Sequence, residues 1–101
     1  EGLNEYLATK GITPEQAGTH SGLSETSCML DIDEELVDRD RFEEGFMGAV
    51  DSDRLHEEGL AAFTNNGILG DARGSTAEIG KKLNEMTAEF YAQEIRERIG
   101  E

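Results

Sequence analysis

Cysteine is almost absent from this chain. Cys28 is the only one among 101 residues, so no disulfide bond can form within the chain. Tryptophan is missing, and aromatic side chains make up only 6% of the sequence. No apolar run is long enough to span a bilayer, and no signal-peptide pattern is present. These absences argue against a disulfide-stabilised scaffold and a membrane-spanning protein, and they predict a cytoplasmic location.

Basic residues are also scarce. Nine Lys and Arg stand against 23 Asp and Glu, giving a net charge of −14. Such a surface repels nucleic acid and anionic membranes, so we expect neither as a partner. The carboxylates are spread along the chain instead of forming a tail, and salt screens the repulsion between them. Adaptation to a high-salt cytoplasm explains this pattern better than a mildly acidic mesophilic origin, so we expect a halophilic protein.

The first third of the sequence predicts short helices. Residues 2–10 carry apolar side chains at helical spacing, and Gly11 is a plausible end. Residues 13–16 read Thr-Pro-Glu-Gln, which is typical of an N-cap, a proline at the first helical position and a capping-box glutamine. We expect a further short helix over residues 24–30 and a helical turn over 33–37 that is capped by its first residue.

The middle of the chain is charged and less regular. Residues 53–58 favour a short helix ended by Gly59, and residues 61–64 favour a strand. Asn66-Gly67 is a strong turn signal, for which a hairpin is one possibility.

The last helix has the clearest pattern. Ser75 and Glu78 have the spacing of a capping box. Gly80 lies inside the helix at a cost of about 1 kcal/mol relative to alanine, which predicts close packing against a neighbour. The helix carries one apolar stripe: Ile79, Leu83, Met86, Phe90, Tyr91, Ile95 and Ile99.

Residues 19–27 carry the side chains best suited to chemistry. His20 is one of only two histidines, and an imidazole titrates near neutral pH, so it can give or take a proton during turnover. Gly22 allows the backbone to pass close to a ligand. A helix beginning after Gly22 would point its first N–H groups toward the space beside His20.

This stretch resembles the creatininase family of metal-dependent amidohydrolases, whose members carry His-Ala/Ser-Gly-x-x-Glu-Thr-Ser, an apolar run and an acidic Glu-Leu-Val. The corresponding segments here are residues 20–22, 25–27, 28–30 and 35–37. A second family-like segment covers residues 66–71 and 75–80. The resemblance spans roughly residues 15 to 100.

The resemblance implies an α/β fold. The expected architecture is a three-layer α/β/α domain with a largely parallel sheet, of which residues 1–101 form the C-terminal, mostly helical portion. Members hold two metal ions, mainly through a Glu-x-His pair, an Asp and another His. Because this chain has no Glu-x-His pair, we expect the metal ions (Zn, Mn or Fe) to be bound mainly by an N-terminal part absent from the chain. That part is therefore an expected partner, and a homo-oligomer, a hexamer by resemblance, is a second.

Three residues are the candidates for the site. The resemblance gives His20 a catalytic role in handling protons of the amide that is cleaved; the alternative is a loop histidine bonded to a backbone carbonyl. Glu25 either faces the metal site, where it is a possible ligand, or bonds back to the helix cap. Ser27 either contacts substrate or caps backbone. Cys28 is expected to be a buried small hydrophobe, and His56 to be solvated.

Two functions compete. The first is a metal-dependent amidohydrolase that cleaves a C–N bond in a small cyclic amide or formamide: creatinine, a formamidopyrimidine or a peptide precursor. The absence of tryptophan counts against creatinine, because the family's creatinine-cleaving members place tryptophans around the substrate. The second is a non-enzymatic acidic helical module that docks a partner through the 79–99 helix.

Overall fold

The computed structural model describes residues 2–100; Glu1 and Glu101, which the predicted domain span includes, lie outside the described residues. Five α-helices and three short 3₁₀ helices account for the regular structure of this part of the chain. In chain order they are α1 (Gly2–Thr9), α2 (Pro14–Ala17), α3 (Leu23–Asp33), η1 (Glu34–Leu36), η2 (Arg39–Arg41), α4 (Ser52–Glu58), η3 (Leu60–Ala62) and α5 (Ala77–Arg98).

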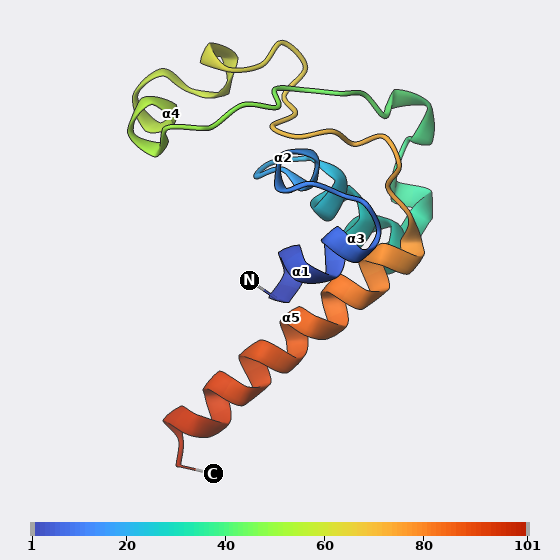
Figure 1. Ribbon diagram of the computed structural model, residues 1–101, viewed down its shortest axis with the longest axis vertical. Helices are drawn as coiled ribbons and strands as arrows, with labels where there is room; N and C mark the ends of the chain where they lie inside the picture. The colour runs from blue at the N-terminus through green and yellow to red at the C-terminus, as the bar shows by residue number, and fades with distance from the viewer. Residues whose placement is uncertain (1, 101) are drawn as a thin grey trace.

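The core lies where α1, α2 and α3 meet the first half of α5. Figure 1 shows α5 running past these helices and extending away from them toward the C-terminus. Tyr6 and Cys28 pack against the core while remaining partly exposed. The buried cluster consists of Leu7, Ile12, Ala17, Leu23, Ile79 and Leu83.

The contact between α3 and α5 is very close. A Cβ added at Gly80 would lie 1.8 Å from the carbonyl oxygen of Ser27, so only glycine fits there. The side chain of Ser27 is fully buried in the same contact and accepts a hydrogen bond from the Thr76 N–H at 3.1 Å. The prediction that Gly80 marks close packing is therefore confirmed.

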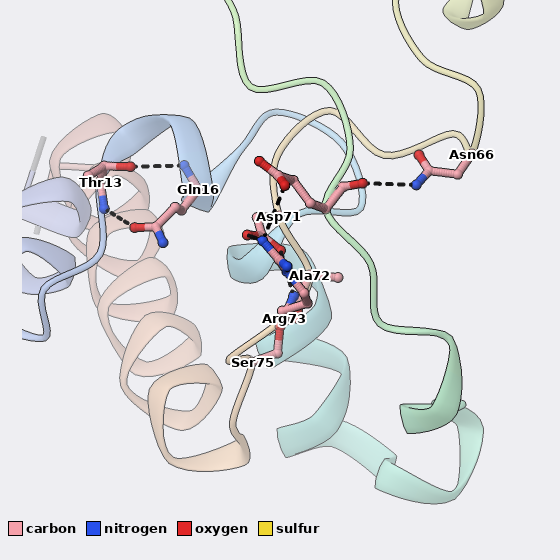
Figure 2. Close-up of polar contacts among 8 residues, drawn as sticks. Thr13, Gln16, Asn66, Asp71, Ala72, Arg73 and Ser75 are labelled. Carbon is pink, nitrogen blue, oxygen red and sulfur yellow. Dashed lines mark hydrogen bonds and ion pairs between the residues drawn. The ribbon is translucent and has the colours of Figure 1, made fainter.

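Several local predictions for the first third are confirmed. Thr13 and Gln16 form the expected capping box at the start of α2 (Figure 2). Asp33 caps η1 by accepting from the Glu35 N–H. Gly22 is the N-cap of α3, which extends to Asp33 and is longer than the predicted 24–30 segment.

No β-strand forms within residues 2–100, so the predicted strand at 61–64 is wrong. Residues 61–62 lie in η3 instead, and Phe63 and Thr64 after it donate their N–H groups to the Leu60 carbonyl, because no neighbouring strand offers backbone partners. Asn66 forms a turn by accepting from the Ile68 N–H, and no hairpin follows from it. The sheet expected from the resemblance is not confirmed by this part of the chain, where pairing is limited to isolated bridges, one of them between His20 and Leu69.

The start of α5 also differs from its prediction. Thr76, not Ser75, is the N-cap, and its hydroxyl accepts from the Ile79 N–H. Ser75 is buried and donates its hydroxyl to the Ala72 carbonyl at 2.7 Å, so it cannot serve as the cap (Figure 2). The helix itself is confirmed over Ala77–Arg98. Among the described residues, no helix combines the length and the apolar character needed to cross a membrane.

Candidate active site

The loop that carries His20, residues 18–22 between α2 and α3, is held by close packing of backbone on backbone. Gly18 lies against residues 69–70, where an added Cβ would be 2.2 Å from the Leu69 carbonyl oxygen. A Cβ added at Gly70 would in turn lie 2.7 Å from the Gly18 Cα and 3.1 Å from the Gly22 Cα. Both Gly18 and Gly70 have positive φ, which glycine adopts without steric cost. The glycines therefore fix the path of the loop.

Hydrogen bonds fix the loop further at His20. Its carbonyl accepts from the Leu69 N–H at 2.8 Å, and its N–H donates to the Leu69 carbonyl at 3.3 Å, which forms an antiparallel bridge. Thr19 donates to the same carbonyl at 2.9 Å. The His20 side chain is exposed, so the backbone is held while the imidazole is free to meet a ligand.

His20 borders an open cleft of about 420 Å³. This volume lies within the range of small-molecule sites. The walls are mostly apolar, with hydroxyl groups from Thr19 and Ser52. The remaining lining comes from Val50, Leu55, Leu60 and Leu69. A small, weakly polar molecule placed here would have one imidazole beside it.

Glu25 makes a hydrogen bond close to the one expected, which was a bond back to the helix cap. Its Oε1 accepts a hydrogen bond from the Ser21 N–H at 2.6 Å, one residue before the helix cap. Ser21 has φ +57°, a left-handed conformation that serine rarely adopts. The Thr26 hydroxyl donates to the Ser21 carbonyl at 3.3 Å. Nothing in the sequence signalled the conformation of Ser21, because the residue types common in that conformation are glycine and asparagine.

Ser27 and Cys28 lie on the packed side of α3. The Ser27 hydroxyl serves the contact with α5 described above, which is a structural use of a residue proposed for substrate contact. Burial raises the pKa of the Cys28 thiol, and the negative charges of Asp31 and Glu25 raise it further. A raised pKa leaves less thiolate, so Cys28 is a poor nucleophile. It packs against the core as expected of a small hydrophobe, but it is partly exposed and not fully buried as predicted.

A buried carboxylate that the sequence analysis did not single out, Asp71, directly follows Gly70, which packs against the loop. Asp71 is 5% exposed, and it accepts from the Arg73 side chain at 2.8 and 2.9 Å (Figure 2). Hydrogen bonds from that side chain hold the pKa of Asp71 below its ordinary value, although burial alone would raise it. Arg73 also reaches Glu44 at 3.3 Å, and Asp71 donates its N–H to the Gln16 carbonyl. The pair thus joins three segments; an Asp-x-Arg spacing after the Asn-Gly turn is the only signal for it.

The two histidines do not meet. His56 lies exposed on α4, where its Nδ1 is 2.9 Å from the Ser52 carbonyl oxygen, as the prediction of a solvated residue implies.

Within residues 2–100, no group of three or more His, Cys, Asp or Glu side chains is placed to hold a metal ion. The residues present therefore do not fit a metal centre by themselves.

Comparison with known proteins gives one match. The model of the creatininase family, described as creatinine amidohydrolase, matches residues 3–95, which is most of the chain. No curated protein and no solved structure matches. The family match covers both segments that carry the sequence resemblance and confirms it.

Proposed function

This chain belongs to the creatininase family, a family of hydrolases, and we propose that it supplies the proton-transfer residue of an amidohydrolase. The substrate is a small cyclic amide or formamide whose C–N bond is cleaved. The observation that carries the proposal is the His20 loop: its backbone is bonded to Leu69 on both sides of His20, and its imidazole is exposed beside a cleft.

The chemistry follows from what amide hydrolysis requires. A nitrogen leaving group must gain a proton before it departs, and histidine is the side chain most often used to give it at neutral pH. His20 in this role donates from its ring to the leaving nitrogen or carries a proton from water. The apolar walls of the cleft exclude part of the water around that transfer, which strengthens polar interactions with the substrate.

The family is generally metal-dependent, but no step is assigned to a metal ion here, since residues 2–100 hold no cluster that fits one. We propose that the ligands for Zn, Mn or Fe come from a part of the enzyme outside these residues, the metal-binding part of the same α/β domain. Glu25, in the first turn of α3, contacts the His20 loop at Ser21, whose N–H already engages its Oε1. We also propose, on the family resemblance, that the enzyme is a cytoplasmic homo-oligomer.

The non-enzymatic alternative draws no support from the comparisons, because the family that matches is a hydrolase family. That alternative depended on the apolar stripe of the 79–99 helix. The first half of the stripe is buried in the chain's own core, so only the second half is exposed and could dock a partner.

The test is the turnover of His20→Ala in the active enzyme. Loss of a general acid or base should lower kcat by ~10²–10⁴-fold while the metal content stays the same. His56→Ala is the matched control, an exposed histidine outside the loop, and should leave kcat unchanged. Loss of bound metal in His20→Ala would make the residue a ligand, and full kcat with metal in place would make it structural. Either result contradicts the proposal.

A further inference from the structure

We propose that Glu25 is a positioning residue, whose carboxylate holds the Ser21 backbone in the left-handed conformation that presents His20 to the substrate. The inference rests on the proposed role of His20 and adds a device that controls it.

The conformation of Ser21 needs an explanation. Its φ of +57° is the only positive value among the described residues that are not glycine. A left-handed serine brings its Cβ too close to the following carbonyl, so surrounding contacts must hold it in place.

The surrounding contacts are present on both sides of the Ser21 Cα. Glu25 accepts from the N–H of Ser21 at 2.6 Å, and Thr26 donates to its carbonyl at 3.3 Å. The first bond is short and has a charged acceptor, so it is the stronger of the two. Together they fix the two peptide groups that flank this Cα, and with them its φ and ψ.

One of those peptide groups belongs equally to His20. Its carbonyl oxygen is that of His20 and accepts from the Leu69 N–H at 2.8 Å, while its N–H is that of Ser21 and donates to Glu25. The peptide after His20 is thus bonded at both ends, to two different segments of the chain. Rotation of the side chain is then the main freedom left to His20, which is the state expected of a preorganised proton donor.

A positioning role and a chemical role predict different results for two substitutions. Glu25→Gln keeps an oxygen that can accept from the Ser21 N–H, but it cannot transfer a proton or ligate a metal as a carboxylate does. Glu25→Ala removes the acceptor altogether. The conservative variant therefore separates the two roles.

The experiment measures kcat and KM of both variants in the active enzyme. We expect Glu25→Ala to lower kcat roughly tenfold to hundredfold with KM little changed, as a misplaced catalytic group does. Glu25→Gln should stay within about fivefold of the parent, because a neutral acceptor is weaker but still present. Glu78→Ala is the matched control, since Glu78 is also an exposed carboxylate in the first turn of a helix, and its kcat should not change.

A second variant tests the conformation directly. Glycine adopts positive φ freely, so Ser21→Gly in the Glu25→Ala background should recover roughly five- to tenfold of the lost kcat. Thr26→Val removes the weaker bond and should lower kcat by less than Glu25→Ala does. Circular dichroism melting curves of all variants confirm that they are folded.

Three results overturn the proposal. A Glu25→Gln variant as impaired as Glu25→Ala would overturn it, because equal impairment would give the carboxylate a chemical role. Parental kcat in both Glu25→Ala and Thr26→Val would show that the bonds position nothing, and absence of recovery with Ser21→Gly would show that the Ser21 conformation is not what Glu25 controls. If His20→Ala retains kcat, the proposed function fails instead, so the two failures are distinguishable.

Discussion

The two halves of α5 carry similar apolar side chains and meet different surroundings. Ile79 and Leu83 in the first half are 7% and 3% exposed and belong to the core cluster, whereas Phe90, Tyr91 and Ile95 in the second half are 58–59% exposed. The same helix therefore belongs to the core at one end and extends away from it at the other (Figure 1). An apolar groove of about 660 Å³ lies between α1 and the second half.

The candidate site is connected to the buried half of α5 and not to the exposed half. The first half of α5 is tied to α3 through Ser27, Thr76 and Gly80, and α3 begins directly after the His20 loop. The loop is therefore anchored to the covered half of the helix. Its geometry depends on contacts within residues 16–83, and the exposed half contributes none of the contacts described above.

The largest contrast is expected from truncating one apolar side chain in each half. Leu83→Ala should cost about 2–5 kcal/mol of unfolding free energy, because it leaves a cavity in the core. Ile95→Ala should cost less than about 0.5 kcal/mol, because its side chain is mostly in solvent. Urea unfolding of both variants is the measurement. Equal costs would mean that the second half is covered in solution and would remove the distinction between the halves.

A pair of glycines sharpens the comparison at the α3–α5 contact. Gly80→Ala places a methyl group against the Ser27 carbonyl and should destabilise the chain by about 1–3 kcal/mol. Gly2→Ala, in α1, meets only the end of the Met86 side chain at 3.5 Å, so it should be neutral or gain up to about 1 kcal/mol from helix propensity. Thermal melts report both. A neutral Gly80→Ala would contradict the close contact.

The Asp71–Arg73 pair gives a smaller, pH-dependent effect. Asp71→Asn should cost about 1 kcal/mol at pH 7, a value reduced because the Arg73 side chain is 59% exposed. The folded-state pKa of Asp71 is lowered, so its contribution is fully present above the unfolded-state pKa and is lost as pH falls through the folded-state value. The stability difference between parent and variant should therefore disappear in acid.

The control for that pair is Glu34→Gln, which disrupts the exposed ion pair with Arg39 and should change stability by less than about 0.5 kcal/mol at any pH. A parent–variant difference for Asp71→Asn that stays constant down to acid pH would contradict the lowered pKa.

What could be predicted from the sequence was local. The capping box of Thr13 and Gln16, the Asp33 cap and the end of α4 at Gly59 each involve residues within four positions of one another. Gly80 could be predicted as a packing site because glycine inside a strong helix pattern needs a reason.

What could not be predicted depends on residues far apart in the sequence. Ser75 lost its capping role because its burial directs the hydroxyl to Ala72, leaving Thr76 to cap α5. The strand at 61–64 failed because its propensity found no partner strand. His20 was identified as the candidate, but the glycine packing and the Ser21 conformation that hold it depend on residues 69–70, about fifty positions away.

The effect of salt on stability is not tied to any single contact, because salt screens the whole acidic surface. Repulsion among charges that sum to −14 weakens as the Debye length falls from about 10 Å at 0.1 M to about 3 Å at 1 M salt. The unfolding midpoint should rise with potassium chloride over that range. A midpoint that is flat or falls would refute salt adaptation.

Hydrogen exchange of individual amides in the unmodified protein tests most directly whether the chain's own backbone contacts hold the His20 loop. Thr19 and Leu69 donate across the bridge, so we expect their amides to exchange as slowly as those of buried positions in α3. Exchange of both amides at the rate of an unstructured peptide, with α3 still protected, would contradict that expectation.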